Sequence, residues 1–290
     1  MGPPRTGGLA LAALGVLAFS FSLPMTKIAV RGLDPFVAAI GRAAVASVPA
    51  GLVLWWRRAA RPTAAQARRL LAVVLGVVVG FPLLTAYALH HTASAHGAVV
   101  IGLLPLTTAG FAVVRAGERP SVAYWLCSLV GLAAVVAYSL HSGGGSLHAA
   151  DALLLGAVLA AGLGYTDGAM LARTMGGPLV ICWALVLAAP VAWAATVAMA
   201  ARTGGVHASG GQWAAFAYTA LFSMFLGFFA WYAGLARAGI ARAGQLQLAQ
   251  PALSVVWGWP LLGERLTASA LATATVVFAA VAVGRRAAVR

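Results

Sequence analysis

Arg42 and Asp167 are ionisable side chains within long apolar stretches of this sequence, where a charge is costly. Arg42 stands about two turns into the stretch 35–56, and Asp167 lies in the second half of the stretch 151–172. Charged groups inside membrane-spanning segments usually face a cavity or one another. Because a guanidinium stays charged, Arg42 predicts a watery cavity, a partner or a carboxylate substrate. Asp167, six residues before Arg173, is expected to be a proton-coupling site or an amine counter-ion, or else an interfacial carboxylate or the partner of a cytoplasmic arginine.

Lys27 is the only lysine and lies three or four residues from the outer end of the apolar stretch 8–30. Its long stem can lie in lipid while the ammonium reaches the interface. Alternatively, Pro24 breaks the helix and turns Lys27 toward an inner cavity. Both interpretations stay open on the sequence alone.

Polar amides and aromatic rings extend this set of candidates. Gln247 and Gln250 enter the stretch 240–262, where buried glutamines either bond a neighbouring helix or line a cavity. Pro251 frees the backbone carbonyl of Gln247, and such broken helices are tolerated where they line a cavity. For any one aromatic ring, packing is the ordinary alternative to a place in the cavity wall. The predicted substrate-binding residues are Phe19, Lys27, Arg42, Tyr87, His96, Tyr165, Asp167, Trp231, Tyr232, Gln247 and Gln250.

Composition indicates a protein that crosses a membrane many times. The chain is 62% hydrophobic and 8% charged, with a mean hydropathy of +0.94, whereas a soluble domain carries roughly 25% charged residues. The net charge of +14 is dispersed between apolar stretches, which indicates cytoplasmic loops and not a nucleic-acid partner. Cys127 and Cys182 lie inside apolar stretches without metal-ligand or disulfide spacing. With five acids in the chain, we expect no metal site, no cofactor and no catalytic residue.

Ten apolar stretches are long enough to cross a bilayer, which takes roughly 20 residues. The predicted fold is therefore an all-α membrane protein with ten transmembrane helices. We interpret the first stretch as a helix and not as a signal peptide, because no small-residue cleavage site stands out. The expected spans are 8–30, 35–56, 70–89, 93–114, 120–140, 151–172, 177–200, 212–235, 240–262 and 267–284.

An internal duplication organises these helices. Pro105 and a Gly-Glu-Arg triplet at 117–119 recur as Pro251 and the same triplet at 263–265. Both landmarks are 146 residues apart, so a single register aligns them. We therefore predict two five-helix repeats, 1–145 and 146–290.

Basic residues fix the predicted orientation. If the N-terminus is cytoplasmic, fourteen arginines fall in inside loops, and only Arg31, Arg202 and Arg265 fall outside. Both termini are therefore predicted to be cytoplasmic. Because five is odd, the second repeat then crosses the membrane upside down relative to the first. Inverted repeats recur in secondary transporters, with the substrate site near the midplane, and an exchange of shape between the halves gives alternating access.

Two further features are interpreted as structural. Glu118 and Glu264 begin the last helix of each repeat, where a carboxylate favours the positive end of the helix dipole. Small residues at every fourth position over 156–168 let two helices approach closely. Such a ridge serves packing within one chain or contact between two chains of a homodimer, and both alternatives stay open.

The repeated element resembles that of the drug/metabolite transporter superfamily, in its EamA-type branch of bacterial metabolite exporters. The resemblance rests on 105–119 and 251–265, on Phe-Ser-Phe-Ser at 19–22 followed by Lys27, and on Arg42. It covers the whole chain. It implies the ten-helix fold and the transport of small metabolites, but no particular substrate.

The leading hypothesis is a multi-pass secondary transporter of the plasma membrane that exports a small metabolite such as an amino acid. Proton coupling is an open expectation. An intramembrane enzyme would require paired acids, a His-Glu-x-x-His helix or a Gly-x-Ser-x-Gly turn, and the sequence has none of these. A membrane scaffold would need no cavity, which leaves Arg42 and Lys27 without an explanation.

Overall fold

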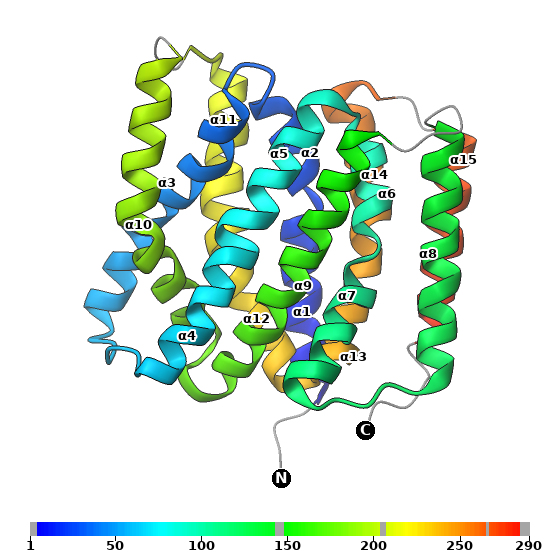
Figure 1. Ribbon diagram of the computed structural model, residues 1–290, viewed down its shortest axis with the longest axis horizontal. Coiled ribbons are helices and arrows are strands. Elements are labelled where there is room, and N and C mark those ends of the chain that lie inside the picture. Colours follow the sequence, from blue (N-terminus) through cyan, green and yellow to red (C-terminus); the bar gives the residue numbers. More distant parts are fainter. Residues whose placement is uncertain (1–4, 143–147, 204–206, 265–266, 285–290) are drawn as a thin grey trace.

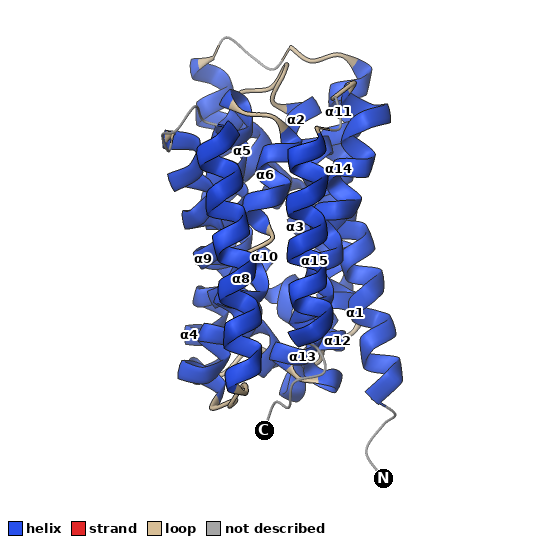
Figure 2. Cartoon of the chain, turned by 90° about the vertical axis from the view of Figure 1, so that its right-hand side faces the viewer, coloured by secondary structure: helices blue, strands red, loops and turns tan. Residues whose placement is uncertain are grey.

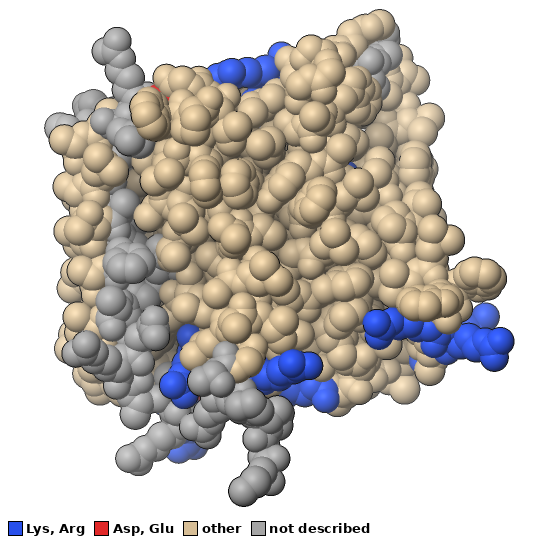
Figure 3. Space-filling model, turned by 180° about the vertical axis from the view of Figure 1, so that it is seen from behind, with Lys and Arg blue, Asp and Glu red and all other residues tan. Residues whose placement is uncertain are grey.

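The computed structural model describes residues 5–142, 148–203, 207–264 and 267–284, and every regular element in these ranges is a helix. This confirms the predicted all-α class. The helices stand side by side in one bundle, and α1 begins at the end of the bundle where α15 finishes (Figure 1; Figure 2). Lys and Arg gather at the two ends of the face in Figure 3, with a broad band largely free of them between. Such a band is what a bilayer requires of a protein surface.

The order of elements follows the predicted stretches closely. Three of them, η1 to η3, are π-helical turns, and η4 is a 3₁₀ turn. The elements are α1 (Arg5–Ser20), α2 (Ser22–Ala29), α3 (Pro35–Trp56), α4 (Ala64–Val73), η1 (Val74–Gly80), α5 (Phe81–His91), α6 (Ser94–Ile101), α7 (Leu104–Phe111), η2 (Ala112–Ala116), α8 (Val122–Ser142), α9 (Ala149–Met175), α10 (Gly177–Arg202), α11 (Gly210–Tyr218), η3 (Thr219–Leu226), α12 (Gly227–Ala238), α13 (Ile240–Gly244), η4 (Gln245–Leu248), α14 (Ala249–Leu262) and α15 (Ala268–Gly284).

Seven helical stretches of the described chain are long and apolar enough to cross a membrane. The other three expected spans coincide with α8, with the succession α13, η4 and α14, and with α15, and all of these are helical. The seven stretches are Gly7–Ala29, Pro35–Trp56, Ala64–His91, Ser94–Ala116, Ala149–Met175, Gly177–Arg202 and Gly210–Ala238.

Helices far apart in the sequence form the main packing pairs. α1 packs along α12, α3 along α10 and α9 along α4, η1 and α5. α8 packs along α15 at one edge of the bundle (Figure 1; Figure 2). Each of these pairs joins a helix of the first half of the chain to a helix of the second half, so each half covers part of the other's surface.

Glycine lets two of these helices touch through their backbones. A Cβ atom placed on Gly234 of α12 would lie 2.5 Å from the backbone nitrogen of Ala12 in α1. On the predicted small-residue ridge of α9, a Cβ on Gly164 would lie 2.9 Å from Val77 of η1, and one on Gly168 would overlap the ring of Tyr232. The ridge therefore serves packing within the chain.

The first expected helix is interrupted where α1 ends and α2 begins, at Phe21. Pro24 lacks an N–H, so the carbonyl of Ser20 four residues earlier has no helical partner. Ser254 of α14 donates its hydroxyl to that carbonyl at 2.6 Å. The break therefore provides a polar contact between α1 and α14.

Two glutamates bind the N-terminal ends of helices in the other half of the chain. Glu118 accepts hydrogen bonds from the backbone N–H groups of 240–241 at 3.0 and 2.9 Å, where α13 begins. Glu264 accepts them from the N–H groups of 94–95 at 2.8 and 3.0 Å, where α6 begins. A carboxylate there satisfies free N–H groups and complements the helix dipole. The prediction that each glutamate serves the helix that follows it is therefore wrong.

We expect Gly234→Ala to destabilise the protein, because the added methyl group would push α12 away from α1. Overpacking of this kind costs roughly 1–3 kcal/mol. The control is Gly110→Ala, since no atom lies within 4 Å of a Cβ placed there; it should be neutral or slightly stabilising. Thermal unfolding of the two purified variants tests this, and equal melting temperatures would contradict close contact between α1 and α12.

Candidate functional site

A small cavity lies inside the bundle, among helices of both halves. Its free volume is about 20 Å³, which holds about one water molecule. Aromatic and aliphatic walls surround a few polar groups, so the cavity suits a ligand with one polar and one apolar part. The lining residues are Phe19, Ser22, Arg42, Val77, Phe81, Tyr165, Ser223, Met224, Phe228 and Gln250.

Arg42 on α3 is the charged group of this lining. Its side chain is 4% exposed, and its Nε atom is buried without a hydrogen-bond partner. All five acids of the chain are engaged elsewhere, so none of them neutralises this guanidinium. Asp34 caps α3, Glu118 and Glu264 cap α13 and α6, Asp151 pairs with His96, and Asp167 pairs with two other arginines.

The two predicted glutamines lie at the irregular part of the α13–α14 stretch. Gln250 lines the cavity, is 3% exposed, and has an Oε1 atom without a partner. Gln247 lies near Tyr165, and its buried amide makes no hydrogen bond of good geometry. The structure thus brings Gln250 to the same cavity as Arg42, from the opposite half of the chain.

Aromatic rings build one wall of the cavity. The rings of Phe19 and Tyr165 lie parallel, with centroids 6.5 Å apart, and Phe228 approaches Phe19 at 4.9 Å. Trp231 makes T-shaped contacts with the rings of Phe19 and Tyr165 and is not itself part of the cavity lining. The hydroxyl of Tyr232 donates to the carbonyl of Gly164. Trp231 and Tyr232 therefore support the wall, and neither lines the cavity.

Several lining residues were not singled out from the sequence. Ser22 and Ser223 join α2 to η3 through a buried hydroxyl–hydroxyl hydrogen bond of 2.6 Å. Val77 and Ser223 are 146 residues apart, as are Phe19 and Tyr165. Both members of each pair line the cavity. The spacing of 146 residues between the repeats could therefore have been used to predict a lining residue in one half from its equivalent in the other.

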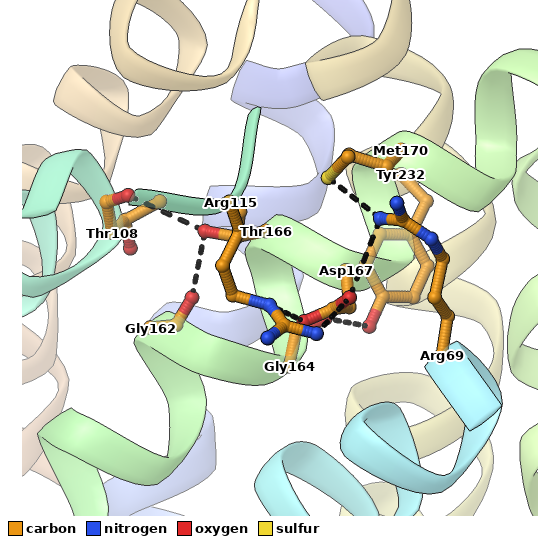
Figure 4. Close-up of polar contacts among 9 residues, drawn as sticks. All are labelled: Arg69, Thr108, Arg115, Gly162, Gly164, Thr166, Asp167, Met170 and Tyr232. Carbon is orange, nitrogen blue, oxygen red and sulfur yellow. Dashed lines mark hydrogen bonds and ion pairs between the residues drawn. The ribbon is translucent and has the colours of Figure 1, made fainter. Parts of the chain in front are cut away.

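Asp167 lies outside the cavity, in a cluster of ion pairs (Figure 4). Arg115 binds both carboxylate oxygens of Asp167, at 2.6 and 2.8 Å. Arg69 approaches the same carboxylate at 3.5 Å and donates to the sulfur of Met170. Asp167 is fully buried, and the cluster ties α9 to α4 and η2. Its partners are these two arginines and not Arg173, which lies 3.6 Å from Glu118.

Lys27 does not line the cavity, and its ammonium group binds the end of a neighbouring helix. Its ammonium donates to the backbone carbonyls of Leu89 at 2.7 Å and Thr92 at 2.8 Å, at the C-terminal end of α5. A cation there satisfies free carbonyls and complements the negative end of the helix dipole. Neither interpretation drawn from the sequence included this contact between α2 and α5.

The two remaining candidates lie away from the cavity. His96 pairs with Asp151 at 2.7 Å, beside a separate open hollow of about 420 Å³. Tyr87 is 38% exposed and lines neither hollow, so its place in a pocket wall stays a prediction. Within the described ranges, no three His, Cys, Asp or Glu side chains gather closely enough to hold a metal ion.

Comparison with known proteins finds similarity over the whole chain. The EamA-like transporter family matches residues 6–140 and, a second time, residues 148–284. A Bacillus subtilis (strain 168) protein named "Uncharacterized transporter YdeK" is 43% identical over 289 residues, which cover 97% of this chain and 98% of that protein. A solved crystal structure, 17% identical, has a TM-score of 0.72 and covers 96% of both chains. That structure supports the fold alone.

We expect Arg115→Gln to destabilise the protein more than Arg69→Gln. Arg115 makes two short bonds to a fully buried carboxylate, whereas Arg69 approaches it at 3.5 Å. Loss of Arg115 should cost about 2 kcal/mol, below the usual value for a buried pair because its side chain is partly exposed to solvent. Thermal unfolding of both variants measures this, and an equal loss for Arg69→Gln would show that the two arginines hold Asp167 equally.

Proposed function

The chain belongs to the EamA-like transporter family, and we propose that it is a secondary transporter for a small metabolite that bears a carboxylate, such as an amino acid. The observation that carries this proposal is Arg42, a buried guanidinium without a counter-ion in a cavity with aromatic walls. The family and the relative's name both indicate a transporter and not an enzyme. The proposal includes export across the plasma membrane, which rests on the resemblance to metabolite exporters.

The chemistry of the lining supports an amino acid or a similar amphipathic acid. An unpaired buried charge is costly, and a substrate carboxylate would neutralise Arg42 through two parallel N–H···O bonds. The free Oε1 of Gln250 would accept a hydrogen bond from the substrate's ammonium group. Phe19, Phe81 and Phe228 would contact its apolar side chain. The carboxylate and the ammonium group of the ligand would then bind Arg42 and Gln250, whose Nε and Oε1 atoms otherwise have no hydrogen-bond partner.

Alternating access completes the proposed mechanism. A free volume of about 20 Å³ cannot hold an amino acid, so this conformation would be an occluded one. Transport would then require the cavity to open to one side of the membrane and afterwards to the other. The Asp167 cluster would close one end, and the Lys27 and Glu264 contacts would close the other. Opening either end would break a small number of polar contacts at a time.

We also propose that the chain crosses the bilayer ten times, as two inverted repeats, 1–145 and 146–290. The double family match supports this, and so do contacts that recur at the spacing of 146 residues. The acceptors Glu118 and Glu264 and their donors 240–241 and 94–95 are related in this way. So are the capping boxes of α4 and α11, at 63–66 and 209–212, and the π-helical turns η1 and η3.

Single cysteines at equivalent positions test the inverted topology. Ala65 and Gly211 are both exposed and 146 residues apart. In a background without Cys127 and Cys182, Ala65→Cys and Gly211→Cys should react with a membrane-impermeant maleimide from opposite sides of the membrane, with Ala65→Cys protected in intact cells. Labelling of both positions from the same side would rule out the inverted arrangement.

Arg42→Gln should abolish transport without harming the fold. Loss of a buried, hydrogen-bonded charge pair with the substrate should weaken binding on the order of a hundredfold. Removal of an unpaired buried charge should leave thermal stability unchanged or raised. Arg31→Gln, at an exposed loop position, is the control.

Metabolite profiling of medium and cytosol provides the measurement. A carboxylate-bearing compound enriched outside with wild type and Arg31→Gln, but not with Arg42→Gln, would establish export and name the substrate. Wild-type flux in Arg42→Gln would remove this residue from the transport site. A large loss of melting temperature in that variant would instead indicate a structural role.

A further inference from the structure

A second site lies at the end of the bundle where α3 finishes, well apart from the central cavity. It is an open groove of about 660 Å³, formed by the last turn of α3, the segment that follows it, and Trp183 of α10. Its residues belong to neither the transport site nor the contacts at the two ends of that site. The lining consists of Leu54, Trp55, Trp56, Arg58, Ala59, Arg61 and Trp183.

The groove holds two arginines that no acid of the chain neutralises. Arg58 and Arg61 are exposed, and no ion pair joins either of them to another described residue. The five carboxylates of the chain are all bound at other places, as described for Arg42. No acid of the chain therefore competes with an external anion for these two guanidinium groups.

Arg58 occupies a backbone conformation that normally belongs to glycine. Its φ is 46°, and it is the one non-glycine residue of the described chain with a positive φ. It ends α3 in a paired set of bonds, with its own N–H donating to the carbonyl of Trp55 and the N–H of Ala59 donating to that of Leu54. A side chain there costs roughly 1 kcal/mol or more compared with glycine. An arginine at this position is explained if its guanidinium has a ligand to bind.

The surroundings of the groove are those of a lipid headgroup region. Trp55 and Trp56 are 78% and 79% exposed at the end of a helix long enough to cross a membrane, where tryptophan prefers the interface. Leu52 and Leu187, one turn from Trp56 and from Trp183 toward the apolar band, are also exposed. The indole Nε1 of Trp183 is buried without a hydrogen-bond partner. A phosphate at the groove would thus have acyl chains along α3 and α10.

We propose that this groove binds the phosphate group of an anionic phospholipid in the adjoining leaflet. Arg58 and Arg61 make charge-assisted hydrogen bonds to the phosphate oxygens, as arginine does at phosphate sites generally. The acyl chains lie against the exposed leucines of α3 and α10. Such a lipid fixes the end of α3, the helix that carries Arg42, at the membrane surface. The site is independent of the transported substrate.

Titration of the delipidated full-length protein with lipids, followed by native mass spectrometry, tests this proposal. Phosphatidylglycerol should bind more tightly than phosphatidylcholine. The double variant Arg58→Gln/Arg61→Gln should weaken phosphatidylglycerol binding on the order of tenfold or more. The matched control is Arg237→Gln/Arg242→Gln, which removes the same charge from two other exposed arginines and should bind as wild type.

Arg58→Gly separates binding from folding. Glycine suits a φ of 46°, so this variant should melt at the same temperature as wild type or higher, and it should still lose affinity for phosphatidylglycerol. Three results would overturn the proposal. They are equal binding of the two lipids by wild type, an equal loss of affinity in the control variant, and displacement of the lipid by inorganic phosphate at similar concentration, which would indicate a site for the free anion.

Discussion

The scarcity of carboxylates is the constraint from which the polar structure of this protein follows. Nineteen Lys and Arg residues face five Asp and Glu residues, and an unpaired charge is costly in the apolar interior of the bundle. Every acid is consequently committed to a helix end or to a cation. Asp167 is buried between two arginines, and Glu118 and Glu264 hold helix ends. Arg42 is buried without an acid partner, so the transport site proposed here takes its anion from outside the chain.

The two glutamate caps connect the two halves of the chain. Each carboxylate belongs to one half and satisfies the first N–H groups of a helix in the other half. Free N–H groups at a helix start must find acceptors when water is scarce. Each half therefore depends on the other to satisfy one of its helix ends. The contacts of α1 with α12 and of α3 with α10 add a shared apolar core to this polar exchange.

The central cavity and the groove beside Trp55 each contain arginine that no acid of the chain neutralises. The cavity lies inside the bundle, whereas the groove lies at its end. Arg42 is buried among rings, and the substrate proposed for it brings both a negative charge and an apolar surface. Arg58 and Arg61 are exposed beside exposed tryptophans, and the anion proposed for them is a lipid phosphate. The two sites lie on opposite parts of the same helix, α3, since Arg42 is in its first half and Trp55 and Trp56 are at its end. Lipid binding at one end would restrain the helix that carries the other site.

The sequence by itself determined the helical class and the positions of the long apolar helices, and it singled out Arg42 as a charge within one of them. These are properties of local composition, because about 20 apolar residues in a row form a helix in lipid and a charge among them stands out at once. It did not determine the partners of the charged groups. Asp167 pairs with Arg115, 52 residues away, Lys27 binds carbonyls at the end of α5, and each glutamate caps a distant helix. Those partners depend on which helices become neighbours, which is decided by backbone contact at residues such as Gly234 and Gly164 and by the packing of whole faces. Side-chain identity gives no information about such neighbours until the tertiary structure brings them together.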